Sequence, residues 1–208
     1  NFGKFKRHHV LFEALRQLPA SLRVVLIGQH EGTRTAASLM AEAAAFGVAN
    51  RFELRESVPH QQVCEALSQA RISLVLSRRE GSCVVVAESL FADTPVGLLE
   101  GAEIGSAQFI TPQTGRFLAE ANLASQLQDF LARAHECKPR QWAMKQGISC
   151  HESSAFLNLL LKDAAAADSR PWTADLAPMQ WRPDPQLIRK EDQERLQSGV
   201  TELRARYG

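Results

Sequence analysis

Cysteine is scarce in this sequence, and no two cysteines form a CxxC pair. The four that are present, Cys64, Cys83, Cys137 and Cys150, are widely spaced. That spacing argues against a structural zinc site and against a disulfide framework. It is typical of a reducing compartment, so we expect a cytoplasmic protein.

The sequence also lacks an excess of charge of either sign and any long apolar run. Its 24 Lys and Arg side chains and 23 Asp and Glu side chains give a formal net charge of +1. A dedicated nucleic-acid binder usually carries a basic excess, so we expect no nucleic-acid partner. No apolar run approaches the roughly 20 residues of a membrane-spanning helix. The basic start, NFGKFKRHH, has no apolar segment behind it and is not a signal peptide.

The composition that remains is that of an ordinary globular protein. The 208 residues are 45% hydrophobic and 23% charged, which argues against a disordered or fibrous chain. A chain of this length buries roughly 70% of its unfolded surface and so has a core of its own. The length fits one large domain, or a medium domain with an appendage.

Short apolar runs alternate with helical patterns over most of the chain. The expected strands are residues 22–28, 51–54, 72–76 and 95–99, and the expected helices are residues 10–18, 33–46, 59–70, 84–92 and 121–136. The run LRVVLIG at residues 22–28 predicts a strand that is covered on both faces. The alternation predicts an α/β fold, a Rossmann-like three-layer domain with a mostly parallel sheet.

The character of the chain changes after residue 163, and we place a domain boundary there, giving residues 1–163 and 164–208. The segment 169–185 holds four of the nine prolines and two of the three tryptophans. It cannot be helical, so we expect an extended arm, followed by a charged helix from Pro185 to Tyr207. The arm packs on its own domain or docks on another domain or protein. Trp172 and Trp181 either stack on ligand rings or, as we favour, pack between domains.

In a parallel α/β sheet, ligands bind beyond the carboxyl ends of the strands. Here those ends carry Gly28, the segment 77–82 and the segment 100–105. The stretch SRREGSCVVVAES, residues 77–89, predicts a polar turn and then a helix that begins near Ser82. Free N–H groups at a helix start bind phosphate, and Gly81 leaves room for a ligand to approach.

Two carboxylates flank this turn. At 1.5 Å per helical residue, Glu80 and Glu88 lie about 10 Å apart, which suits two groups that hold hydroxyls at opposite ends of a diphosphate-linked ligand. Alternatively, Glu80 is an acidic residue that a helix start favours by its dipole alone. Glu88 lies on a helix that we expect to be mostly buried, where a carboxylate needs a partner.

The stretch from Ser77 to Gly97 resembles the signature of the retaining glycosyltransferases of family 4 (group 1), which have the GT-B architecture of two Rossmann-like domains. The matching motif residues are Ser77, Glu80, Gly81, Glu88, Pro95 and Val96. LRVVLIG, RFELRESVP and TGRFL resemble further segments of the family's donor-binding domain, in the same order. The resemblance covers about residues 4–136.

The resemblance implies roles for the motif residues. Glu80 contacts the donor sugar and acts in catalysis, and Glu88 contacts the ribose. The backbone N–H groups of Gly81, Ser82 and Cys83 meet the sugar or the phosphates. Apart from this backbone contact, we interpret Cys83 as a small packing residue, because the reaction needs no thiol.

The resemblance also assigns residues outside the motif. Lys6 neutralises the diphosphate as a second catalytic residue, Gly28 lies near the diphosphate, and Ser57 lies where relatives recognise the nucleobase. With Lys6 and a helix start stabilising the leaving group, no metal or other cofactor is implied. The substrate is a nucleoside-diphosphate sugar, and the reaction is transfer of a hexosyl group to a glycan or lipid-linked acceptor.

The sequence departs from the family pattern at several positions. The family's arginine five positions before Lys6 is Asn1 here, so Lys4 or Arg7 replaces it or the leaving group is handled less well. His30 replaces a glycine, and Ser82 and Cys83 replace Phe-Gly. Relative to the pattern, the first strand of the donor domain and the whole N-terminal acceptor domain are missing. We therefore expect a fragment or an isolated donor module, inactive alone, with peripheral membrane association as a further expectation for the full-length protein.

Two other functions compete with this one. The departures at Asn1 and at Ser82 and Cys83 favour a non-catalytic interaction module that keeps the fold and uses the C-terminal arm as its working surface. A Rossmann-type oxidoreductase is disfavoured because no GxGxxG motif follows the first strand.

Overall fold

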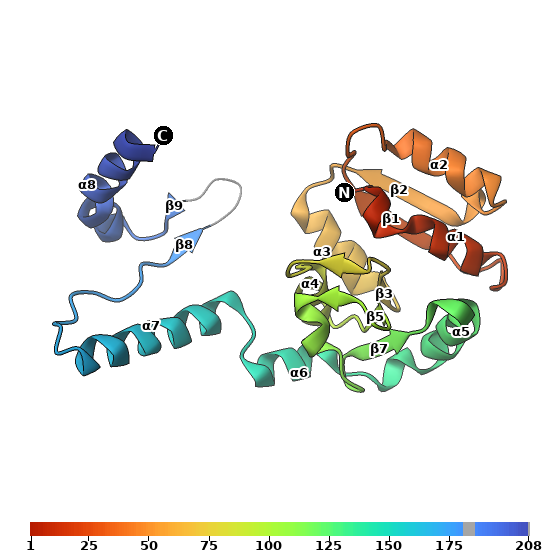
Figure 1. Cartoon of the computed structure of the whole chain (residues 1–208). Coiled ribbons are helices and arrows are strands. Elements are labelled where there is room, and N and C mark those ends of the chain that lie inside the picture. Colours follow the sequence, from red (N-terminus) through yellow and green to blue (C-terminus); the bar gives the residue numbers. More distant parts are fainter. Residues whose placement is uncertain (181–185, 208) are drawn as a thin grey trace. The chain divides into compact units, whose positions relative to one another are not determined.

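The computed structural model describes residues 1–180 and 186–207, and the chain forms two compact units, Asn1–Ile148 and Ser149–Gly208 (Figure 1). We placed the boundary after residue 163, but helix α7 (Cys150–Ala167) runs through that position unbroken. The break lies where α6 (Pro139–Gln146) ends at Gly147, which has a left-handed backbone, and where Ser149 caps α7. A glycine at a helix end and a serine at the next helix start mark the division in the sequence.

The strands of the first unit pair in parallel, as predicted. Strand β1 (Val24–Gly28) pairs with β2 (Phe52–Glu56), and β5 (Val96–Leu99) lies between β3 (Ser73–Val75) and β7 (Gly115–Leu118). A short pair, β4 (Arg79–Glu80) and β6 (Glu103–Ile104), extends beyond β3 and β5. Figure 1 shows the two larger groups of strands with helices packed around them. The α/β class with parallel strands is therefore confirmed.

The two larger groups of strands are not hydrogen-bonded to each other. Within residues 1–180 and 186–207, no strand pairs with the second edge of β1 or of β3. Phe2 lies at the free side of β1, where its N–H donates to the carbonyl of Gln29 at 2.7 Å. Val25 is 42% exposed, so the prediction that β1 is covered on both faces is wrong. The reason is that the hydrophobic core covers the face of Val24 and Leu26 and leaves the opposite face of Val25 open.

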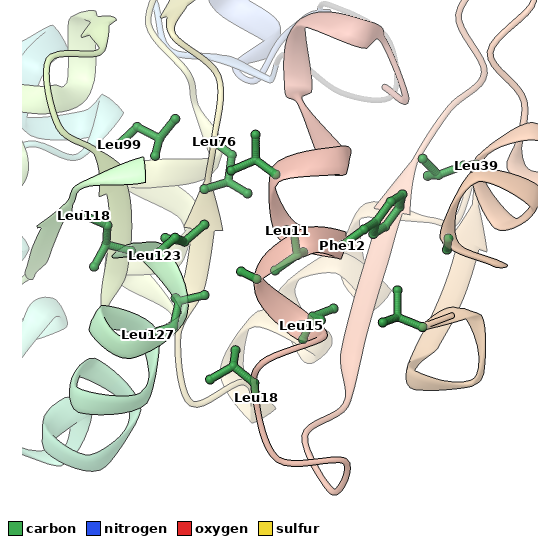
Figure 2. Packing of buried hydrophobic residues seen from close by; sticks show 14 of the residues in the cluster. Leu11, Phe12, Leu15, Leu18, Leu39, Leu76, Leu99, Leu118, Leu123 and Leu127 are labelled. Carbon is green, nitrogen blue, oxygen red and sulfur yellow. The ribbon is translucent and has the colours of Figure 1, made fainter. Parts of the chain in front are cut away.

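Helix α1 (His8–Leu15) joins the two groups of strands through its apolar side chains. It buries Val10, Leu11, Phe12, Ala14 and Leu15. Figure 2 shows Leu11, Phe12 and Leu15 between Leu39 on one side and Leu76, Leu99 and Leu118 on the other. The helix ends three residues before the predicted end, but Leu18 remains buried in the same cluster. Packing on α1 therefore replaces backbone pairing between the two groups.

The remaining helices follow the predicted pattern with shorter bounds. They are α2 (Ala36–Ala45), α3 (His60–Gln69), α4 (Val85–Phe91) and α5 (Leu123–Arg133), and single turns of tighter helix lie at η1 (Lys4–Lys6), η2 (Ala49–Arg51), η3 (Gly105–Phe109), η4 (Glu120–Asn122) and η5 (Ala134–Glu136). Helix α4 was predicted to begin near Ser82, but it begins at Val85 because Cys83 has a left-handed backbone, with φ of 51°. A helix cannot extend through that conformation.

The second unit consists of α7, a short antiparallel pair β8 (Met179–Gln180) and β9 (Gln186–Leu187), and α8 (Lys190–Tyr207). The predicted non-helical arm is present at residues 169–178. It contacts α7, because the N–H of Leu176 donates to Asn158 at 2.9 Å and Lys162 pairs with Asp175 at 2.7 Å.

Two predictions for the arm concern Trp181 and Pro185, which lie outside the described residues. The charged helix that we expected from Pro185 begins at Lys190. Within residues 1–180 and 186–207, no helix is both long and apolar enough to cross a membrane.

Candidate functional site

The motif segment 77–89 begins at the carboxyl end of β3, and its turn is held by one close backbone contact. The N–H of Gly105 donates to the carbonyl of Gly81 at 2.7 Å. A methyl group on Gly105 would lie only 2.8 Å from that carbonyl oxygen, so this position requires glycine. A methyl group on Gly81 itself would meet nothing within 4 Å. The turn is thus fixed on its inner side and open on its outer side.

Lys6 and Glu80, the two predicted catalytic residues, contact each other. Nζ of Lys6 lies 2.9 Å and 2.8 Å from Oε1 and Oε2 of Glu80, and the side chains are 26% and 12% exposed. Burial alone raises the pKa of Glu80, but the hydrogen bonds from Lys6 help to bring that pKa below its usual value. Glu80 is therefore a carboxylate at neutral pH, paired with an ammonium at the edge of the open turn.

Arg7 turns the chain between Lys6 and α1. It has a left-handed backbone, with φ of 56°, which is unusual for a residue with a Cβ. Its guanidinium donates two hydrogen bonds to Glu120, at 3.0 and 2.6 Å, and Arg78 donates a third at 2.8 Å. These hydrogen bonds lower the pKa of Glu120 to about 2. Arg7, one of the two residues that we expected to replace the family's arginine at Asn1, is thus paired with Glu120.

Glu120 is a residue that sequence reasoning missed. It follows the strand TGRFL by two positions and carries no motif, so no local signal marks it. Arg78 and Arg79, which precede Glu80 in the motif turn, both pair with acidic side chains. Arg78 pairs with Glu120, and Arg79 lies 3.5 Å from Glu103.

Glu88 lies on a packed helix, where we expected its carboxylate to have a partner, and that partner is His60. Its Oε1 lies 2.9 Å from Nε2 of His60, at the start of α3. The Glu88 side chain is 26% exposed, so it remains accessible to a ligand. Sequence reasoning singled out Pro59 as the start of this helix but passed over His60. Only the packing of α3 against α4 brings the imidazole to Glu88.

The backbone between the two glutamates offers free donors. In the described part of the chain, the N–H groups of Gly81, Ser82 and Cys83 have no hydrogen-bond partner. The side chain of Cys83 packs in the cluster formed by α4 and β5 and is only 8% exposed. Burial raises the pKa of its thiol to about 11. Cys83 is thus a packing residue with a protonated thiol, whose backbone faces the turn.

Gly28 and Ser57 lie together at the carboxyl ends of β1 and β2. The N–H of Ser57 donates to the carbonyl of Gly28 at 2.9 Å. A methyl group on Gly28 would lie 2.7 Å from the ring of Phe2, so packing alone already requires glycine there. Ser57 is exposed and has a left-handed backbone, with φ of 53°. Their roles toward a ligand stay predictions.

Metal coordination has no support in the side-chain arrangement. Across residues 1–180 and 186–207, no three His, Cys, Asp or Glu side chains are placed to hold one ion. The charged groups at the motif turn are instead an ammonium and a carboxylate in direct contact.

Comparison with known proteins decides the family. The profile described as "Glycosyl transferases group 1" matches residues 1–148, which is the whole of the first compact unit. The chain belongs to the group 1 glycosyl transferases. A search of the curated proteins by sequence found no match.

Solved structures show how much of a group 1 glycosyl transferase the chain represents. It is similar to sucrose-phosphate synthase from Thermosynechococcus elongatus, with a TM-score of 0.68 and 20% identity over 80% of this chain and 44% of that one. HepE from Anabaena, solved with UDP, matches with a TM-score of 0.64 and 14% identity over 80% and 47%. WaaG, a glycosyltransferase of lipopolysaccharide biosynthesis, matches with a TM-score of 0.55 and 24% identity over 69% and 38%. The chain spans less than half the length of each. Its fold is that of the C-terminal, donor-binding portion of GT-B glycosyltransferases.

Proposed function

We propose that residues 1–148 bind a nucleoside-diphosphate sugar and that the protein transfers its hexosyl group to a glycan or lipid-linked acceptor. The observation that carries the proposal is the contact of Lys6 with Glu80 beside the open turn at Gly81. It brings a cation, a carboxylate and free backbone N–H groups to one place at the carboxyl ends of parallel strands, where α/β proteins bind ligands.

The charges of this site match the parts of such a donor. The diphosphate is an anion, so it draws the ammonium of Lys6 and the N–H groups of residues 81–83 toward itself. Glu80, released from Lys6, then accepts hydrogen bonds from sugar hydroxyls, which a carboxylate does well. Glu88 is left to accept from the ribose hydroxyls. Lys6 and Glu80 thereby exchange each other for complementary parts of the ligand.

The same groups favour the reaction itself. When the bond between C1 of the sugar and the phosphate oxygen breaks, the electron pair stays on the phosphate. Once the diphosphate is bound, Lys6 and the backbone N–H groups are in place to stabilise that growing negative charge, and stabilisation of this kind usually contributes more to the rate than any other effect. The acceptor hydroxyl then forms the new bond at C1 and gives its proton to the leaving phosphate oxygen. The acceptor itself is bound by a part of the protein outside the first unit.

Relatives indicate which nucleotide to test first. HepE was solved with UDP and also with UDP-glucose, so UDP is the leading candidate for the nucleotide of this chain. Since the chain covers less than half of each relative, we expect it to bind nucleotide and to transfer nothing without an acceptor-binding part. Four cysteines without a disulfide agree with a cytoplasmic location.

Titration calorimetry of the full chain with UDP, GDP, ADP and UDP-glucose tests the proposal. We expect at least one nucleotide to bind, and Glu80→Gln to weaken UDP-glucose more than UDP, because the carboxylate contacts the sugar. Glu103→Gln is the matched control, since Glu103 lies on the neighbouring strand β6 with its side chain 76% exposed. Absence of heat with every nucleotide, or an equal loss for UDP and UDP-glucose, would refute it.

A second candidate is a non-catalytic module that keeps the fold. It is favoured by one observation: the family's arginine is missing at Asn1, and Arg7, a possible substitute, is bound to Glu120. This candidate predicts that Glu80→Ala in the full-length protein leaves the amount of glycosylated product in cells unchanged. A product that disappears with this substitution favours the enzyme.

A further inference from the structure

Glu88 is held by one neighbour from another helix. Nε2 of His60 lies 2.9 Å from Oε1 of Glu88, across 28 positions of sequence, and joins the start of α3 to α4. The two side chains are 50% and 26% exposed. The contact therefore lies at a surface that a ligand can reach, and outside the apolar core.

The neighbours of His60 select one arrangement of its ring protons. An ionised carboxylate only accepts hydrogen bonds, so Nε2 of a neutral imidazole carries the proton toward Glu88. Nδ1 is then an acceptor. Sγ of Cys64, one helical turn along α3, lies 3.7 Å from Nδ1 and 4.0 Å from Nε2, so the thiol contacts the ring without pointing at one nitrogen. The directed hydrogen bond of the ring is therefore the one to Glu88.

The hydrogen bond from His60 fixes one carboxylate oxygen of Glu88 and leaves the other open. Oε1 faces His60, whereas Oε2 has no hydrogen-bond partner within residues 1–180 and 186–207. A free glutamate side chain loses rotamer freedom when a ligand fixes it, and that loss weakens binding. A glutamate that is already held by His60 avoids most of that loss.

We infer that His60 is a positioning residue for ribose recognition, which holds Oε1 of Glu88 so that Oε2 is aimed at the 2′- and 3′-hydroxyls of a nucleoside diphosphate. The inference rests on the proposed function, because it takes Glu88 as the ribose contact. His60 lies outside the motif of Glu80 and Glu88 and touches no reacting atom. It acts on the ligand only through the carboxylate that it holds.

The test measures how strongly the full chain distinguishes a ribose from its dideoxy analogue. Calorimetry gives the dissociation constants of the tightest-binding nucleotide among UDP, GDP and ADP and of its 2′,3′-dideoxy form, and their ratio reports the ribose contact alone. A hydrogen bond to a charged group corresponds to a ratio of about 10 to 100. Glu88→Gln is expected to reduce this ratio by about tenfold or more, since it removes the charge.

Variants on α3 then isolate His60. His60→Leu removes the hydrogen bond, and we expect the ratio to fall about fivefold or more toward that of Glu88→Gln. His60→Gln places an amide N–H near the position of Nε2 and is expected to restore at least half of the ratio. Gln61→Leu is the matched control, because Gln61 neighbours His60 but bonds to Glu65, and the ratio should not change. His60→Ser, which suits a helix start, repeats the loss if the leucine variant does not fold.

The failures are distinguishable. If Glu88→Gln removes the ratio and His60→Leu keeps it, His60 does not position Glu88 and the inference is wrong while the proposed function stands. If no nucleotide binds, or Glu88→Gln leaves the ratio intact, the ribose assignment itself fails and the inference fails with it. In the double variant His60→Leu with Glu88→Gln, a loss no larger than that of Glu88→Gln alone supports the inference, because the two residues then act through one contact.

Discussion

Lys6 and Glu80 neutralise each other across 74 positions of sequence, with Nζ within 2.9 Å of both carboxylate oxygens. The pair keeps a partly buried carboxylate charged and holds an ammonium beside the turn at Gly81. Under the proposed function, a diphosphate competes with Glu80 for that ammonium. The strength of this competition can be measured.

Replacing Lys6 by alanine should weaken nucleotide binding more than any other single loss of charge at the site. We expect the dissociation constant of UDP to rise about 10- to 100-fold, as for removal of a charged hydrogen-bond donor. Lys4→Ala, two residues away and exposed, is the control and should change it less than threefold. Equal effects of the two substitutions in calorimetry at one salt concentration would show that only the overall charge matters.

Glu120 should make the chain sensitive to strong acid. Hydrogen bonds from Arg7 and Arg78 lower its pKa from 4.5 to about 2. Its stabilising effect is therefore present above about pH 4.5 and is lost as the pH falls toward 2. Glu120→Gln should cost about 1 kcal/mol of unfolding free energy at pH 7, since the pair is partly exposed, and little at pH 2.

Urea denaturation at both pH values checks the prediction for Glu120. Glu13→Gln is the control, because Glu13 forms an exposed pair with Arg16. The prediction is wrong if Glu120→Gln costs the same stability at pH 7 and at pH 2.

His8 should govern stability in a separate, milder range of pH. Burial, and after it the charge of Arg34, lowers the pKa of His8 from 6.5 to about 4. The unfolded chain therefore takes up a proton first, so stability is full above pH 6.5 and declines as the pH falls to about 4. The decline should reach at most about 3 kcal/mol. His8→Phe, which keeps a ring between Phe2 and Phe12, should flatten this part of the stability curve, and the exposed His9→Gln should not.

Two glycine substitutions should separate stability from binding: Gly115→Ala should destabilise the fold, whereas Gly81→Ala should weaken binding of UDP and leave stability nearly unchanged. Gly115→Ala places a methyl group against the backbone of Val96 on the central strand β5, and we expect a loss of about 3 kcal/mol or more. Gly81→Ala meets no atom of the chain, so the unfolding free energy should change by less than about 0.5 kcal/mol. If a ligand approaches the backbone at Gly81, UDP should nevertheless bind at least about fivefold more weakly, while an unchanged affinity would exclude that approach.

Local patterns in the sequence predicted most of the longer elements of the first unit, but not α6 or the short strands β4 and β6. The apolar runs that became β1, β3 and β5, and the glycines and prolines between them, act over a few neighbouring residues, so they can be read without the fold. The same holds for the motif with Glu80 and Glu88. Lys6 was assigned only through the family resemblance, and its contact with Glu80 required the fold.

What the sequence did not reveal depends on contacts between distant segments. Arg7 and Cys83 have left-handed backbones at positions where no glycine signals them, and tertiary contacts hold them there. Glu120 and His60 could be recognised only from the fold, which places η4 beside Arg7 and α3 beside α4. The division at Ile148 and Ser149 was overlooked because the change of composition after residue 163 lies within α7.

Among the described strands, the β1–β2 pair is joined to the others by side-chain packing, much of it on α1, and by no backbone hydrogen bond. The alignment of the proposed nucleotide site depends on this apolar bridge. Ser57 and Gly28 belong to one side of it, and Glu80 and Glu88 to the other. Loosening the bridge, for example by Leu11→Ala, would let β1 and β2 exchange their amide hydrogens ahead of the rest of the unit. In the proposed function, the two ends of a nucleotide sugar would then contact the β1–β2 pair and the β3–β5–β7 group while these two groups fluctuate independently.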